Sequence, residues 1–461
     1  MLVFMDISSM SATAKQDNNE LLLKRMTELL STGSLNEVRQ FIQELYPAEI
    51  ALLIESLAPE DRKIIWKLIP PTTVGEILVD LHVEVASGLI EITDWKDLAT
   101  ALESLESDDL IDLLHTLPEP LLSKVTESIG IQERRRLESA LSYDDNTAGG
   151  LMSLDVLTVR ADVSLDVVLR YLRKRGSMPR ATDNLIVVDR NDHFQGVLPL
   201  AVLLTKNPHA MVSEVMDFSM SGIPYQMPAG EVALLFEQRD MISAPVVAED
   251  GKVLGRITVD DIVDVIREEA DHSLMSMAGL DEEQDMFSPV VTSAKRRAVW
   301  LGINLLTAFL ASWVIGLFEA TLDRIVALAV LMPIVASMGG IAGSQTLTLV
   351  IRGLALRQIS STNAIRLFKK EIAVGVVNGA LWATVVACIA GIWFQSAGIG
   401  LLLGCAMLIN FACAAFAGAS IPLMLQKMGI DPALAGGVLL TTVTDVVGFM
   451  AFLGLATFFL M

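Results

Sequence analysis

The chain has 461 residues, of which 52% are hydrophobic, and its formal net charge is −21 at pH 7. The charge is unevenly divided: residues 1–295 hold 25 basic and 50 acidic residues, whereas residues 296–461 hold 9 basic and 5 acidic ones. The acidic first part offers no basic patch or aromatic platform, which excludes nucleic-acid binding and favours contact with cations. The slightly basic, very apolar second part predicts a membrane domain.

The N-terminal segment and the cysteines argue against a secreted, disulfide-bonded protein. The first ten residues, MLVFMDISSM, lack the basic region and the long apolar run of a signal peptide, so we expect the N-terminus to stay in the cytosol. Cys388, Cys405 and Cys413 all lie in apolar stretches without CxxC spacing, which argues against a disulfide framework and against a zinc site. We expect residues 1–18 to be a flexible terminus.

Two soluble modules follow. Residues 19–145 show repeated Leu and Ile spacing with acidic helix starts, as in Ala58-Pro-Glu-Asp, which predicts short helices stacked into a superhelix. Residues 146–272 contain a strand–turn–strand pattern twice, about sixty residues apart, with a helix behind each pair. The predicted strand pairs are Leu185–Asp189 with Phe194–Leu198, and Ala244–Ala248 with Val253–Ile257.

A connecting helix over residues 273–297 is expected to lead into a membrane domain of five spans, residues 298–461. A spanning helix needs about 20 mostly apolar residues. Basic residues gather in the loops before span one, between spans two and three, and between spans four and five, which places the N-terminus inside and the C-terminus outside. The predicted spans are Ala298–Phe318, Ile325–Leu354, Ile372–Phe394, Gly400–Leu425 and Ala433–Leu460.

Asp445 is a lone carboxylate in the fifth predicted span. A charge at this depth costs several kcal/mol and normally faces a cavity or a partner. Thr441, Thr442 and Thr444 precede it, and the span has no basic residue to neutralise it, so we predict a cation site. The alternative is a hydrated, inert carboxylate near the membrane edge.

The second predicted span is expected to be interrupted by Pro333 and by a glycine-rich stretch. Irregular backbone at membrane depth is tolerated only where it is buried in protein or lines a watery cavity. Gly339, Gly340 and Gly343 are therefore candidate pore-lining residues, together with Thr441 and Thr444 of span five. Close packing of helices through small residues explains the glycines equally well.

Several motifs together resemble the MgtE-type magnesium transporters. The repeated module, ending in Gly255–Asp261, resembles a tandem of CBS domains, and the preceding segment Tyr143–Met152 (YDDNTAGGLM) looks like that family's junction. The glycine-rich second span and the DPAL start of the fifth are also similar, in the same order along nearly the whole chain. The resemblance implies a homodimer with an ion path lined by spans two and five. Ile341 and Gly437 stand where the family usually has polar or helix-breaking residues, which leaves the ion preference open.

The acidic first part suggests regulation by divalent cations. Asp108 and Asp112 are four residues apart and share a helix face, and further acids gather at the end of the second CBS-like repeat. Crowded carboxylates repel one another, and divalent ions relieve that repulsion. The resemblance implies that these acidic residues match positions where the family binds regulatory Mg²⁺ and closes the pore. Taken singly, each of them could equally be an ordinary solvated carboxylate at the surface. The candidates are Asp108, Asp112, Asp240, Asp261, Asp264, Glu269 and Asp271.

The sequence thus predicts a multi-domain protein of the inner cell membrane: an α-helical superhelix, an α/β CBS pair and a polytopic α-helical domain. No GxxxxGK[ST] phosphate loop is present, so we expect passive influx driven by a membrane potential worth about 2.3 kcal/mol per charge per 100 mV, and the resemblance implies that the ion is Mg²⁺. The alternatives are a transporter that prefers Co²⁺ or another divalent cation, and a non-transporting receptor whose CBS pair senses nucleotides. ATP binding to that pair stays open. We expect no enzyme activity, since an intramembrane aspartyl protease would need a second deep carboxylate.

Overall fold

The computed structural model describes residues 5–102, 105, 107–117, 121–122, 141–280, 284–360 and 362–460. The chain forms two compact units. The first comprises Met1–Ala270 with Glu283–Ser288, and the second comprises Asp271–Glu282 with Pro289–Met461.

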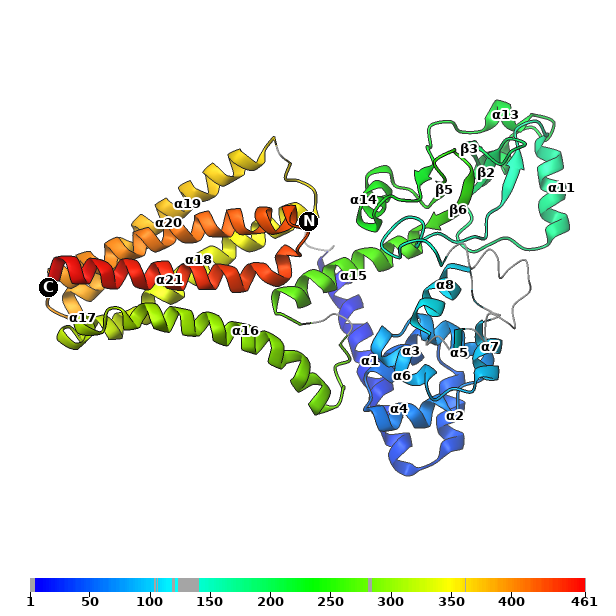
Figure 1. The fold of residues 1–461 in the computed structure, drawn as a ribbon. Coiled ribbons are helices and arrows are strands. Elements are labelled where there is room, and N and C mark those ends of the chain that lie inside the picture. The colour runs from blue at the N-terminus through cyan, green and yellow to red at the C-terminus, as the bar shows by residue number, and fades with distance from the viewer. Residues whose placement is uncertain are drawn as a thin grey trace. The chain divides into compact units, whose positions relative to one another are not determined.

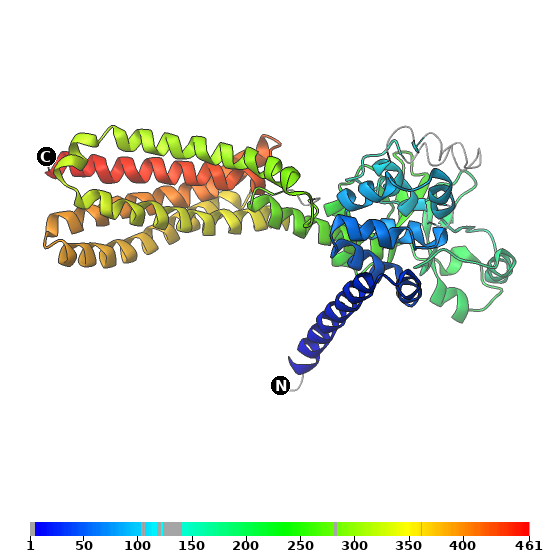
Figure 2. The ribbon, with the colours of Figure 1, turned by 90° about the horizontal axis from the view of Figure 1, so that it is seen from below.

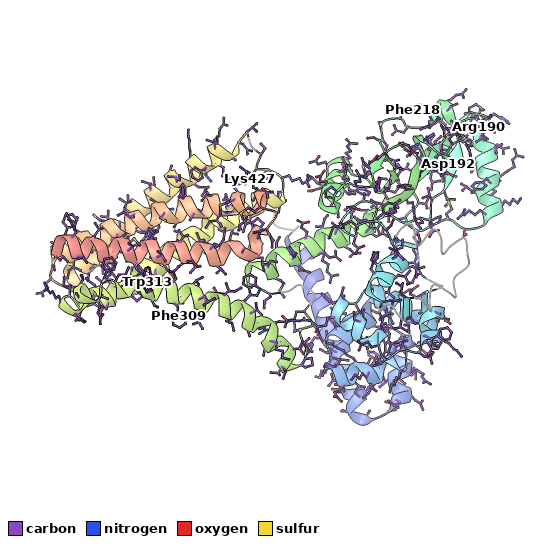
Figure 3. All side chains as sticks on the ribbon, viewed as in Figure 1. Arg190, Asp192, Phe218, Phe309, Trp313 and Lys427 are labelled. Carbon is purple, nitrogen blue, oxygen red and sulfur yellow. The ribbon has the colours of Figure 1, made fainter. Side chains whose placement is uncertain are left out.

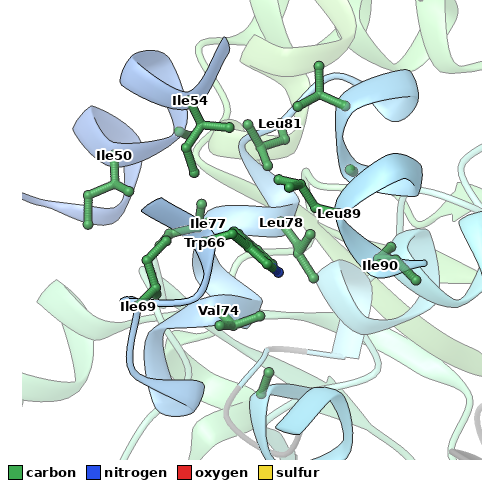
Figure 4. Packing of buried hydrophobic residues seen from close by; sticks show 14 of the residues in the cluster. Ile50, Ile54, Trp66, Ile69, Val74, Ile77, Leu78, Leu81, Leu89 and Ile90 are labelled. Atoms are coloured by element: carbon green, nitrogen blue, oxygen red, sulfur yellow. The ribbon is translucent and has the colours of Figure 1, made fainter. Parts of the chain in front are cut away.

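The first unit begins with a helical domain. Three of its helices start with a proline in the first turn, where a missing backbone N–H leaves no hydrogen bond unmade. Buried aliphatic side chains and Trp66 from successive helices form one core (Figure 4). The helices are α1 Met5–Thr32, α2 Leu35–Gln43, α3 Pro47–Glu55, α4 Pro59–Trp66, α5 Pro71–Val79, α6 Val83–Ile90, α7 Trp95–Leu102 and α8 Ser107–Thr116.

Most of the N-terminal segment expected to be flexible lies in the first helix, and its flexibility stays a prediction. Residues 5–18 belong to α1, which fits a stretch that contains neither Pro nor Gly. Residues 1–4 and the part of the predicted helical domain from 123 to 140 lie outside the described residues.

Two α/β modules complete the first unit and confirm the predicted repeat. Leu185 pairs with Leu198 in one antiparallel strand pair, and Ala244 pairs with Ile257 in the other. A short parallel strand adds a third strand to each sheet. The first module contains β1 Thr158–Arg160, α11 Leu165–Arg175, β2 Asn184–Val188, β3 Phe194–Pro199, α12 Leu200–Thr205 and α13 Val212–Val215. The second contains β4 Ile223–Pro224, α14 Ala229–Arg239, β5 Ser243–Val247, β6 Val253–Thr258 and α15 Val259–Met277.

The second unit holds five helices that are long and apolar enough to cross a membrane, as predicted. They run side by side (Figures 1 and 2), and α20 packs against α18, α19 and α21. Figure 3 shows Phe309 and Trp313 on the outer side of α16, where each is 63% exposed. The helices are α16 Val290–Gly316, the short α17 Glu319–Arg324, α18 Ala327–Ala355, α19 Ala364–Trp393, α20 Ala397–Lys427 and α21 Pro432–Leu460.

Two predicted features of the chain are wrong in detail. The connecting helix expected over 273–297 is divided: α15 ends at Met277, Gly279 has a φ of +68° that favours glycine, and α16 begins only after Pro289. Residues 281–283 of that segment lie outside the described part. The second span is not interrupted, because α18 continues through Pro333 and the glycines. A continuous helix satisfies its own backbone hydrogen bonds in an apolar medium, which a broken one does not.

Candidate functional site

A groove of about 800 Å³ runs between α18 and α21. Asp445 lies on α21 one helical turn after Thr441, and both face α18 across the groove. Asp445 is the only charged residue among the nine that line it. The lining residues are Ala336, Ser337, Gly340, Ile341, Ser344, Gln345, Thr348, Thr441 and Asp445.

The hydroxyl groups of the groove are oriented by the helix backbone. Thr441 donates its hydroxyl proton to the Gly437 carbonyl oxygen at 2.9 Å, and Ser344 donates to the Gly340 carbonyl oxygen at 2.8 Å. Each hydroxyl oxygen therefore keeps its lone pairs for a ligand in the groove. A carboxylate together with such oxygens is the ligand chemistry that hard divalent cations such as Mg²⁺ and Ca²⁺ prefer.

The structure divides the predicted pore-lining residues into two groups. Gly340, Thr441 and Asp445 line the groove, whereas Gly339, Gly343 and Thr444 are buried between helices. A Cβ atom on Gly343 would lie 2.8 Å from Leu440 Cδ1, so that glycine allows close packing of α18 on α21. Thr444 is fully buried and bonds the Leu440 carbonyl oxygen at 3.1 Å.

Asn410 on α20 supports the groove from behind. Its side chain is 1% exposed and donates to the Val335 carbonyl oxygen of α18 at 2.9 Å. A Cβ atom on Gly339 of α18 would lie 2.2 Å from Asn410 Nδ2, and one on Gly448 of α21 would lie 2.7 Å from the same atom. Both groove helices therefore need a glycine where they meet this amide.

The sequence reasoning missed Ser337 and Thr348 in the groove. With Gly340 and Ser344 they recur every three or four residues, which is the spacing of one helix face. That periodicity was visible in the sequence. Of the two departures from the family pattern, Ile341 lines the groove and is 54% exposed, whereas Gly437 lies one turn before Thr441 and has open space beside it.

Three of the predicted regulatory acids come together in the first unit. Asp108 on α8 lies within electrostatic range of Asp260 and Asp261 at the start of α15, and Asp112, one turn further along α8, lies within range of Asp108. Asp112 is exposed at the surface, but desolvation by the surrounding chain, followed by the charges of Asp108 and Asp109, raises its pKa to about 7. Burial and the charge of Asp108 likewise raise the pKa of Asp261 to about 7, although Thr258 donates hydrogen bonds that oppose the shift.

Asp264 borders this acidic cluster, and the other three regulatory candidates lie apart from it. Burial and then the neighbouring Asp260 raise the pKa of Asp264, against the charge of Arg267. Glu269 extends toward Gly230, Asp240 ends α14 with a φ of +49°, and Asp271 is exposed in the second unit. No three His, Cys, Asp or Glu side chains converge to hold a metal ion directly within the described ranges.

The fold and the groove define a class: a polytopic membrane protein with a paired α/β module and an oxygen-lined groove suited to cations. Family models match in the same order along the chain: the MgtE intracellular N domain at residues 45–146, the CBS domain at 148–206 and 212–268, and the divalent cation transporter domain of MgtE at 332–455.

The relatives are similar over nearly their full length. The chain is 29% identical to the magnesium transporter MgtE of Thermus thermophilus, over 95% of this chain and 98% of that protein. It is 26% identical to the magnesium transporter MgtE of Bacillus subtilis, over 96% and 98%. A solved cytosolic domain of the Mg²⁺ channel MgtE in complex with ATP matches 53% of this chain and 99% of its own, with 28% identity and a TM-score of 0.49. The chain belongs to the MgtE family of magnesium transporters, whose matched members are transporters rather than enzymes.

Proposed function

We propose that this protein conducts Mg²⁺ passively across the membrane along the α18–α21 groove, with Asp445 as the ion-binding carboxylate. The observation that carries the proposal is a single carboxylate, beside oriented hydroxyls, in a groove that no basic side chain lines. Mg²⁺ gives up its water reluctantly and is usually bound through one or two carboxylates. One Asp with hydroxyl oxygens suits a largely hydrated ion.

A second copy of the chain would complete the path. The groove is open along one side, and an ion in it would meet lipid there unless another protein surface covered it. A homodimer with two-fold symmetry, the commonest closed assembly, would bring two Asp445 carboxylates to one axis. This arrangement doubles the charge that holds a divalent ion.

The loop charges support an orientation with the soluble domains in the cytoplasm and the C-terminus outside. Arg296 and Arg297 flank the start of the first span, and Lys427 ends α20 on the same side by helix count. Mg²⁺ influx would then follow the inward-negative potential, at about 2.3 kcal/mol per charge per 100 mV.

The acidic cluster is the proposed Mg²⁺ sensor. Asp108, Asp112 and Asp261 fit a regulatory cation: Oδ1 of Asp108 is buried without a hydrogen-bond partner in the described part of the chain, and desolvation, followed by neighbouring negative charges, raises the pKa values of Asp112 and Asp261 to about 7. Bound Mg²⁺ would supply positive charge between α8 and α15. These residues would then hold the two elements together when cytosolic Mg²⁺ is high, and release them when it falls.

A narrow cavity between the two CBS domains bears on the alternative of a nucleotide receptor. The cavity between the two CBS domains has a volume of about 10 Å³, which is room for about one water molecule. Arg256 reaches across it and donates to the Arg180 carbonyl oxygen at 2.6 Å. A nucleotide would have to displace this side chain.

The test of the proposed function is Mg²⁺ flux into proteoliposomes containing the full chain. Asp445→Asn keeps the shape of the side chain and should lower flux more than about tenfold, because a carboxylate and a divalent ion a few ångström apart interact by several kcal/mol at an effective dielectric constant of about 20. Asp323→Asn, in an exposed acid of α17 outside the groove, is the matched control. Equal flux from wild type and Asp445→Asn would remove Asp445 from the path. Flux of Co²⁺ above that of Mg²⁺ would favour the other ion preference.

A further inference from the structure

Residues 285–288, which come just before the first membrane-spanning helix, are held by the N-terminal helical domain. Arg62 on α4 makes a two-pronged ion pair with Asp285: Nη1 to Oδ2 at 2.6 Å and Nη2 to Oδ1 at 2.8 Å. The two side chains are 5% and 8% exposed. Paired hydrogen bonds of this kind are both stronger and more directional than a single charged contact.

Glu84 on α6 holds the same segment from a second helix. Its Oε2 accepts the backbone N–H of Asp285 at 2.7 Å, and its Oε1 accepts the Ser288 hydroxyl at 2.8 Å. The guanidinium group of Arg62 also lies 5.9 Å from the centre of the Phe287 ring. Backbone and side chains of the segment are therefore fixed in position and direction.

The N-terminal domain holds Arg62 ready for this contact. Arg62 Nε donates to the Leu57 carbonyl oxygen at 2.7 Å, and Nη2 also donates to the Glu55 carbonyl oxygen at 3.0 Å. Burial alone would raise the pKa of Asp285, but the hydrogen bonds and charge of Arg62 outweigh it, so the pKa lies below its ordinary value. A buried guanidinium that loses its carboxylate keeps an uncompensated charge, which strongly favours the closed pair.

We propose that Arg62, Glu84 and Asp285 form a clasp through which the N-terminal domain positions the first membrane-spanning helix. Only Pro289 separates Ser288 from the start of α16 at Val290. One residue spans at most about 3.6 Å, and proline fixes its own φ, so the junction has little slack. A movement of the N-terminal domain would thus be transmitted to α16 through residues 285–289, independently of α15. These are positioning residues: they contact no ion in the groove.

The inference rests on the proposed Mg²⁺-gated conduction and goes beyond it. Asp285→Asn and Ser288→Ala change only the clasped segment and leave the core of the N-terminal domain intact, where Arg62 keeps its two carbonyl partners. The measured quantity is the inhibition midpoint, the Mg²⁺ concentration on the cytosolic side at which the flux falls to half. In full-length protein in proteoliposomes, Asp285→Asn should raise this midpoint by about fivefold or more, and Ser288→Ala should raise it less. Flux at low Mg²⁺ should stay unchanged. The charge exchange Arg62→Asp with Asp285→Arg should move the midpoint back toward wild type.

The matched control is Arg170→Met, which removes an exposed ion pair with Asp166 at 2.8 Å, in the first CBS domain. It should leave the midpoint unchanged. A second readout, hydrogen exchange of residues 284–290 in the full chain, does not depend on conduction: exchange should rise in Asp285→Asn and in Glu84→Ala.

Two results would overturn the clasp. The first is that Mg²⁺ inhibits the wild-type flux and Asp285→Asn has the same inhibition midpoint. The second is that hydrogen exchange of residues 284–290 is unchanged in both Asp285→Asn and Glu84→Ala. If Mg²⁺ does not inhibit the wild type at all, the proposed gating fails. The exchange experiment then still decides whether the clasp exists.

Discussion

Two adjacent glycines of α18 provide a sharp test of how the groove is built. A Cβ atom on Gly339 would lie 2.2 Å from Asn410 Nδ2 and 2.8 Å from its Cγ, whereas a Cβ atom on Gly340 meets nothing within 4 Å. Real Cβ atoms essentially never come closer than 3.0 Å, so Gly339→Ala must displace a side chain that is 1% exposed. Gly340→Ala adds the same methyl group to the open groove.

Overpacking of this kind costs about 1–3 kcal/mol, and the lost hydrogen bond from Asn410 to Val335 adds about 1 kcal/mol. We therefore expect Gly339→Ala to lower the unfolding free energy of the membrane domain by about 2–4 kcal/mol. Gly340→Ala should change it by less than about 0.5 kcal/mol and should reduce Mg²⁺ flux by narrowing the groove. Unfolding titrated with detergent, followed by the fluorescence of the membrane-domain tryptophans, measures the first quantity. Equal destabilisation by the two variants would refute the packing of Asn410 against Gly339.

Two further predictions concern the sensor and the ion preference. Because the folded pKa values of Asp112 and Asp261 are about 7, against an ordinary 3.8, the folded chain holds protons that the unfolded chain releases, and stability falls as pH rises from about 4 to about 7. Asp285 and Glu55, with lowered pKa values, act in the opposite direction, so the measurement is the difference between wild type and Asp112→Asn/Asp261→Asn. The double variant should gain thermal stability over wild type at pH 8 without Mg²⁺ and lose that advantage at pH 4 or on adding Mg²⁺; an equal gain at both pH values would contradict the repulsion. Ile341→Asn places an amide on the groove wall at a 54% exposed position. We expect this variant to raise the ratio of Mg²⁺ flux to Co²⁺ flux in proteoliposomes. An unchanged ratio would show that position 341 does not select the ion.

Hydrophobic patterning was sufficient to predict the modules and the five spans, because each depends on a periodicity that one stretch of sequence carries. It also singled out Asp445, since a lone charge in an apolar helix is visible without any fold. It did not separate Gly339 from Gly340. That distinction depends on Asn410, some seventy residues away on another helix, and no local pattern records which face of α18 that amide meets.

For the same reason, the sequence did not predict the clasp. Arg62, Glu84 and Asp285 look like ordinary surface charges in the sequence, and only tertiary contacts between residues more than 200 positions apart bury them together. The acidic cluster was easier to anticipate, because Asp108 and Asp112 share one helix face and Asp260 and Asp261 begin another. Asp240, Glu269 and Asp271 lie outside the cluster because of the direction of the helices that carry them, which the pattern of charges in the sequence does not record.

Asn410 also restricts how the conduction path can change its width. Its amide is wedged against Gly339 of one groove helix and Gly448 of the other, with no room for a methyl group on either side. The Asn410 side chain therefore contacts both α18 and α21, and these two helices cannot move apart without breaking a dry, close-packed contact. In the proposed homodimer, opening and closing would instead turn α18, α20 and α21 of each protomer as one rigid unit, so that the width of the path would depend on the angle between the two units.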